Sequence, residues 1–151
     1  MQVVFDYIED LVGRYAPLKH FQVGYPDEQA GGGATEYPQC FLEAELLLAE
    51  TQAGRYTCTA ALQVLDRPEA HGENLGTRWQ RELLATTGEY VEELLEQLRQ
   101  EDELQDVKLT GLVNLIDVGS DLACGWRMEI SFSFLSQVSR KQVRSRFSPR
   151  A

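Results

Sequence analysis

Few side chains in this sequence have the type and spacing that catalysis requires. Only two histidines occur, His20 and His71, and neither has an acidic partner in the sequence pattern that would orient it as a general base. Glu43 and Glu45 stand two residues apart in a segment with strand-like alternation, which places both on one sheet face about 7 Å apart. Paired carboxylates support acid–base chemistry only in a pocket that holds a second titratable partner. We therefore interpret this pair as part of a solvated or interface face.

The remaining polar clusters predict turns and loops. Asp117 and Asp121 could both contact a cation, but the segment lacks the several oxygen ligands and the closing Glu of an EF-hand, so a hairpin turn is favoured. The glycines at 31–33 are not followed by Lys-Ser or Lys-Thr, which argues against a P-loop and favours a mobile loop. The sequence thus predicts no metal or cofactor site, and it favours a structural or binding protein over an enzyme.

The three cysteines are Cys40, Cys58 and Cys124. They cannot all pair with one another and they form no CxxC motif, so free thiols of a cytosolic protein are predicted. Cys124 is expected to act as a small buried apolar side chain.

Charge is divided unevenly along the chain, whose formal net charge is -10. Residues 136–151, the C-terminal arm, contain no Asp or Glu and carry +5. The other residues carry nine basic and 24 acidic side chains, a net charge of -15. Such an acidic surface repels phosphate, so nucleic-acid binding is disfavoured except through the C-terminal arm. The basic residues of the arm are Arg140, Lys141, Arg144, Arg146 and Arg150.

Three interpretations of the C-terminal arm remain open. It could be a solvated end without a partner, or it could dock on an acidic surface, and a neighbouring copy of the chain would offer one. Fully extended, the arm reaches about 50 Å at roughly 3.3 Å per residue, which is enough to cross a subunit boundary. Contact with packaged DNA is the third interpretation, because five cations can neutralise phosphates. We expect its five basic residues to be interaction residues.

Length and composition predict a single domain. The chain has 151 residues, of which 43% are hydrophobic and 25% charged, which is ordinary for one globular domain with a core. The N-terminus lacks the basic and apolar regions of a signal peptide, and no apolar run approaches the roughly 20 residues that span a bilayer. We predict one domain at residues 1–135 followed by the arm, with no membrane partner.

Hydrophobic periodicity predicts two helices and two hairpins. Helical spacing runs from about Val3 to Tyr15 and from about Thr77 to Glu101. A weak strand is expected at His20–Tyr25. Clear period-two alternation predicts four further strands, at Gln39–Thr51, Arg55–Leu65, Val107–Leu115 and Trp126–Phe134.

This order of elements predicts an α+β fold. Two hairpins joined by a helix favour an antiparallel sheet of four to five strands, covered on one face by the N-terminal helix and the long central helix. The other face is polar, because Glu43, Glu45, Arg127 and Glu129 alternate with apolar residues. Such a face is either wet or docked on a partner, so these four residues are expected to be interaction residues.

Several short motifs accompany this order of elements. With them, the chain resembles the small tail-completion or tail-terminator-like proteins of phages and phage-like elements, of the Bacteroidetes type. The likeness covers most of residues 1–135 and includes no catalytic motif. The motifs are Tyr37-Pro38-x-x-Phe41-Leu42-Glu43, Val64-Leu65-Asp66, Trp79, Asp117-x-Gly119-x-Asp121 and Gly125-Trp126-Arg127.

The resemblance implies a homo-oligomeric ring, commonly a hexamer, that caps the tail tube, docks the neck and uses no cofactor. It also implies a component of a virion or phage-like particle that assembles in the bacterial cytoplasm. A second hypothesis is another neck or baseplate component, or a small binding adaptor. A third is an enzyme that uses Glu43, Glu45 or Asp117 in a pocket. The glycines at 31–33 and the arm match no pattern of the family.

Overall fold

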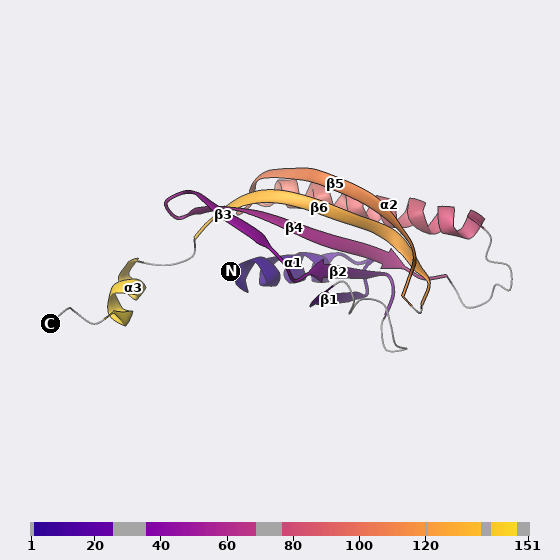
Figure 1. Ribbon diagram of the computed structural model, residues 1–151, viewed down its shortest axis with the longest axis horizontal. Helices are drawn as coiled ribbons and strands as arrows, with labels where there is room; N and C mark the ends of the chain where they lie inside the picture. Colours follow the sequence, from indigo (N-terminus) through magenta and orange to yellow (C-terminus); the bar gives the residue numbers. More distant parts are fainter. Residues whose placement is uncertain (1, 26–35, 69–76, 120, 137–139, 148–151) are drawn as a thin grey trace.

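The computed structural model describes residues 2–25, 36–68, 77–119, 121–136 and 140–147. Figure 1 shows a curved sheet with two helices packed along it and a third, short helix standing clear of it. The elements in chain order are α1 (Gln2–Arg14), β1 (His20–Gly24), β2 (Gln39–Glu43), β3 (Leu47–Gln52), β4 (Arg55–Asp66), α2 (Thr77–Gln100), β5 (Gln105–Val118), β6 (Ala123–Leu135) and α3 (Arg140–Arg146).

The six strands form one sheet in the order β1-β2-β4-β6-β5. Strands β2 and β3 share one edge of β4, with β2 on its C-terminal half and β3 on its N-terminal half. The pair β1–β2 is parallel, and every other described pair is antiparallel. The sheet therefore has β5 as one edge and β1 with β3 as the other.

The predicted sheet of four to five antiparallel strands is wrong. The weak segment at His20 forms a full strand that pairs in parallel with β2, because residues 25–38 supply the dozen or more residues that a parallel connection needs. The single strand expected at Gln39–Thr51 is two strands, β2 and β3. At the break, the Ala44 amide donates to the Gly24 carbonyl oxygen at 2.7 Å. The fold is thus mixed, with six strands, and the helices are α1 of 13 residues, α2 of 24 and α3 of seven.

The core lies between the helices and one face of the sheet, which we call the helix-covered face. Apolar side chains at helical spacing face it from α1 and α2, and alternate residues of β2, β4 and β6 face it from the sheet. The predicted helices at Val3–Tyr15 and Thr77–Glu101 agree with α1 and α2 to within about a residue at each end. The largest fully buried members include Ile8, Leu42, Leu62, Leu98, Met128 and Ile130.

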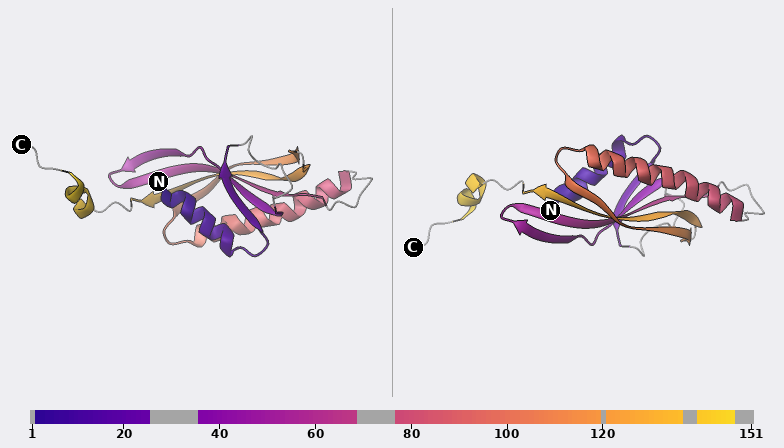
Figure 2. Two further views of the ribbon diagram at one scale, coloured as in Figure 1. Left: turned by 90° about the horizontal axis from the view of Figure 1, so that it is seen from below. Right: turned by 90° about the horizontal axis from the view of Figure 1, so that it is seen from above.

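The two helices also contact each other, as Figure 2 shows for the C-terminal ends of α1 and α2. The Arg14 guanidinium donates to a Glu101 carboxylate at 2.9 Å, and the Tyr15 hydroxyl donates to Glu93. The Tyr15 ring meets the Tyr90 ring edge to face at 6.0 Å. These contacts fix α1 against the C-terminal half of α2.

All three cysteines are free, as predicted, and all three are buried. Cys40 and Cys58 belong to the core on the helix-covered face. Burial raises the pKa of the Cys40 thiol to about 12 and that of Cys58 to about 11. Burial also raises the pKa of Cys124, whose thiol lies near the Leu122 carbonyl oxygen at 3.8 Å.

Candidate functional site

The face of the sheet opposite the helices, the second face, carries a charged cluster from three adjacent strands. Glu43 comes from β2, Gln63 from β4 and Arg127 from β6, and Gln63 lies directly across from Arg127 in the β4–β6 register. Alternation along each strand brings these residues to the same face, since the residues before and after them point into the core.

Arg127 binds Glu43 through two parallel hydrogen bonds. Its Nε donates to Glu43 Oε2 at 2.7 Å and its Nη2 donates to Oε1 at 3.1 Å. Gln63 Nε2 also donates to Glu43 Oε2, at 3.2 Å. The Glu43 residue is only 9% exposed. A two-pronged guanidinium–carboxylate pair of this kind is rigid and strong.

The charge state of Glu43 follows from these partners. Burial by itself raises the pKa of Glu43, but the hydrogen bonds from Arg127 and Gln63 outweigh burial, so the pKa is lowered. The hydrogen bond to Glu43 likewise raises the pKa of Arg127. Near neutral pH, Glu43 is therefore ionised and hydrogen-bonded to Arg127 and Gln63, which suits a structural ion pair better than a general acid or base.

The structure separates the four residues expected on an interaction face. Glu43 and Arg127 are paired with each other, and Glu129 lies 3.8 Å from Arg127 while accepting a hydrogen bond from the Thr110 hydroxyl at 3.0 Å. Glu45 is exposed in the break between β2 and β3, so it does not continue the strand face that carries Glu43. The predicted pairing of Glu43 with Glu45 on one continuous strand is wrong.

The motif Gly125-Trp126-Arg127 has three separate packing functions. A Cβ atom on Gly125 would lie 1.8 Å from the Val64 carbonyl oxygen, so only glycine fits against β4 there. The Trp126 ring points to the helix-covered face, where its Nε1 donates to the Leu84 carbonyl oxygen of α2 at 2.8 Å. Arg127 points to the second face. The motif therefore joins α2, β4 and β2 through consecutive residues of β6.

Asp117 and Asp121 have different partners. Asp121 accepts a hydrogen bond from the Tyr37 hydroxyl at 2.8 Å, and Asp117 accepts one from Gln80 Nε2 at 3.3 Å. Asp117 is the penultimate residue of β5 and Asp121 precedes β6, so the two flank the β5–β6 turn. Across the residues that the structure describes, no group of three or more His, Cys, Asp and Glu side chains is arranged to hold a metal ion.

Sequence analysis missed the glutamines of the second face. Gln39 is completely buried, and within the described residues its two amide atoms have no hydrogen-bond partner. The Oε1 atom of Gln63 is also buried and has no hydrogen-bond partner among the described residues. A polar residue in an alternating strand is ordinarily assigned to solvent, so the pattern contains no signal that these amides are buried.

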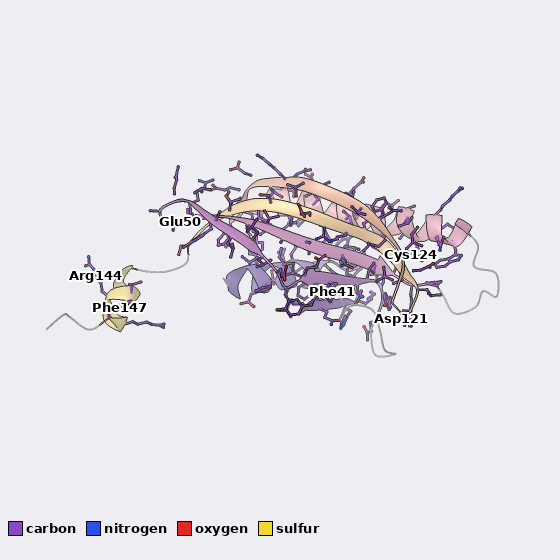
Figure 3. The ribbon with its side chains drawn as sticks, viewed as in Figure 1. Phe41, Glu50, Asp121, Cys124, Arg144 and Phe147 are labelled. Carbon is purple, nitrogen blue, oxygen red and sulfur yellow. The ribbon has the colours of Figure 1, made fainter. Side chains whose placement is uncertain are left out.

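The basic residues of the C-terminal arm fall on or near α3. Arg144 and Arg146 are exposed on this helix, and Figure 3 shows Arg144 beside Phe147, away from the sheet. Arg140 and Lys141 begin α3, but their side chains lie outside the part that the structure describes. Arg150, His71 and the glycines at 31–33 also lie outside it. His20 begins β1 and is partly exposed.

The apolar residues of β5 are distributed differently from the prediction. The strand has irregular pairing between Leu109 and Gly111, where a residue is inserted relative to β6. Leu109 and Leu112 consequently lie opposite Ile130 and Met128 on the helix-covered face, whereas Val113 lies opposite Arg127 on the second face. Exposed apolar side chains of β5 are Leu109 at 37%, Leu112 at 42%, Val113 at 55% and Ile116 at 46%.

Searches of the chain against known protein families and against curated protein sequences give no match. Among the described residues, no helix is long and apolar enough to cross a membrane.

Proposed function

We propose that the chain is a structural subunit of a phage-type tail, a tail terminator or tail-completion ring that caps the tail tube and docks the neck. The observation that supports this most is the outer edge of β5. This strand of 14 residues pairs only with β6 among the described strands and displays four exposed apolar side chains. An edge of this length and composition invites pairing with another chain.

A ring needs two different complementary surfaces on each subunit, because head-to-tail contacts close only by repetition. The sheet offers such a pair, since its two edges are unlike. The β5 edge is long and apolar. On the other side of the sheet, β3 is short and mostly exposed, and it ends in the polar residues Glu50, Thr51 and Gln52. Contacts between unlike edges of successive copies would generate the ring without any cofactor.

The charged cluster favours a structural function over catalysis. The carboxylate of Glu43, whose pKa is lowered, accepts two hydrogen bonds from Arg127 and one from Gln63, so it is ionised and has no proton to donate. We therefore favour assembly in a virion or phage-like particle over an enzyme.

The full chain tests this proposal directly. Sedimentation velocity should show a concentration-dependent oligomer, and negative-stain electron microscopy should show closed rings that bind the end of tubes assembled from a phage tail-tube protein. A chain that is monomeric at every soluble concentration and does not bind the tubes would contradict the proposal. Closed oligomers that ignore the tubes would instead favour another neck or baseplate component.

A further inference from the structure

An apolar hollow opens between α1 and the ends of β5 and β6. Its floor and walls include Val4, Ile8, Phe132, Phe134 and Leu135. Its volume is about 160 Å³. An apolar cavity of about 150 Å³ is known to hold one benzene ring, so this hollow has the size for one aromatic side chain.

The rim of this hollow is acidic. Asp102 and Glu103, in the turn between α2 and β5, line the apolar hollow and also a second hollow beside it. The second hollow is lined further by Asp6, Asp10, Glu101 and Arg14. Five carboxylates thus face one guanidinium, a net charge of -4. Arg14 is itself bound to Asp10 at 3.0 Å and to Glu101 at 2.9 Å, so it does not neutralise Asp102 or Glu103.

The C-terminal arm has the complementary properties. Its helix α3 contains four basic residues and no acidic one in seven positions. Val143 lies in α3, and Phe147 directly follows the last residue of this helix. Phe147 is 75% exposed and Val143 is 39% exposed. A solvent-exposed aromatic ring between arginines is a suitable anchor for an apolar hollow with an acidic rim.

The chain leaves the sheet beside the β3–β4 turn, directly after Leu135, which lines the hollow. After β6 ends, the Ser136 amide donates to the Gly54 carbonyl oxygen at 2.7 Å. Gly54 belongs to the β3–β4 turn, on the β4 side of β6, whereas the hollow lies on the β5 side. In Figures 1 and 2, α3 lies beyond the end of the sheet and clear of α1.

We propose that the hollow between α1, β5 and β6 receives residues 140–147 of a second copy of the chain. Phe147 fills the apolar hollow, and the arginines of α3 lie along the acidic rim. Because arm and hollow are different patches of one surface, the contact is head-to-tail and can be repeated from copy to copy. The inference deepens the proposed function by naming the self-association contact, and it is tested without tail-tube protein.

Charge reversal on both sides provides the test. We expect the arm variant R144E/R146E and the rim variant D102K/E103K each to weaken self-association of the full chain by roughly tenfold or more at low salt, measured by sedimentation equilibrium. An equimolar mixture of the two variants should associate more tightly than either variant alone, because the carboxylates introduced into the arm then meet the ammonium groups introduced into the rim. If the arm docked on its own copy, mixing would change nothing, and that result would overturn the inference.

Two further variants complete the test. F147A should lose association to a similar extent, whereas F147L should retain most of it, because leucine still fills an apolar hollow. The control K19E/R81E makes the same charge change as the arm variant, at exposed positions before β1 and on α2, and should associate normally. Unaltered association of F147A, or a chain that never self-associates, would overturn the inference. Open filaments in place of rings would contradict the proposed ring and leave the arm contact standing.

Discussion

Two regions of the molecule use their polar and apolar side chains in opposite ways. Around Arg127, charged side chains are bound to one another, and the Glu43 side chain is only 12% exposed. Along β5, apolar side chains are exposed, and the neighbouring hollow is lined by five carboxylates and by the guanidinium of Arg14. The residues that a sequence pattern marks as an interaction face thus serve the fold. Four apolar residues of β5, by contrast, are exposed to solvent.

The sharpest test of the first region is the close approach of β6 to β4. G125A should destabilise the chain by about 3 kcal/mol or more, because its Cβ would overlap the Val64 carbonyl oxygen and force two paired strands apart. Urea unfolding followed by circular dichroism measures this. G111A is the matched control on β5, where the nearest atom, Glu129 Cβ, is at 3.6 Å, and a loss equal to that of G125A would contradict the reading.

Removing the guanidinium tests whether the charged cluster is structural. R127M should cost about 2–3 kcal/mol at neutral pH, since it leaves a nearly buried carboxylate without its counter-charge. R55M removes a more exposed pair, Arg55–Asp106 at 3.5 Å, and should cost less than about 1 kcal/mol.

The same variant has a defined pH dependence. The lowered pKa of Glu43 means that the pair stabilises the fold above the pKa of an unfolded glutamate, about 4.3, and that this contribution is lost as pH falls through the folded value. The stability gap between the unmodified chain and R127M should therefore close on acidification. A gap that stays constant down to about pH 3 would show that packing, and not charge, accounts for the loss.

The amide of Gln39 has no hydrogen-bond partner among the residues that the structure describes, and its replacement is therefore predicted to increase stability. Q39M should raise the free energy of unfolding by about 1 kcal/mol, because methionine occupies the buried site without polar atoms that need partners. Q63M should do the reverse, since the amide nitrogen of Gln63 donates to Glu43. Thermal unfolding of both variants measures these changes in stability. A destabilised Q39M would contradict the prediction and would mean that a bound water forms hydrogen bonds with the Gln39 amide.

The smallest effect on stability is expected at the exposed edge. V113E should change the free energy of unfolding by no more than about 0.5 kcal/mol, because Val113 is 55% exposed. The same substitution should abolish ring formation if β5 is an interface, as sedimentation velocity would show. A variant that unfolds readily and assembles normally would reverse the assignment of the two regions.

Periodicity located α1 and α2 well, because helical spacing was uninterrupted over each. It failed where strands are irregular. The extra residue near Thr110 moves Val113 to the face opposite Leu109. The break at Ala44 separates Glu43 from Glu45. In both segments the amino-acid sequence itself alternates regularly, so it does not reveal the irregularity. The parallel pairing of β1 depends on contacts distant in sequence, which local patterns do not contain.

The candidate surfaces were predicted only in part. The charge of the C-terminal arm is a property of composition, so it was evident at once. Its acidic counterpart was not, because Asp6 and Asp10 of α1 meet Glu101, Asp102 and Glu103 only in the folded chain. The pairing of Glu43 with Arg127 across β4 joins residues 84 positions apart and was equally hidden.

The buried thiols have a practical consequence for following assembly. The thiolate is the form that attacks maleimides, and burial keeps Cys40, Cys58 and Cys124 protonated and out of reach. A single cysteine introduced at an exposed position can therefore carry a fluorophore while all three native residues stay in place. Energy transfer between copies labelled in this way would report subunit exchange in real time. The rate at which the unmodified chain is slowly labelled would measure how often it unfolds far enough to expose its buried thiols.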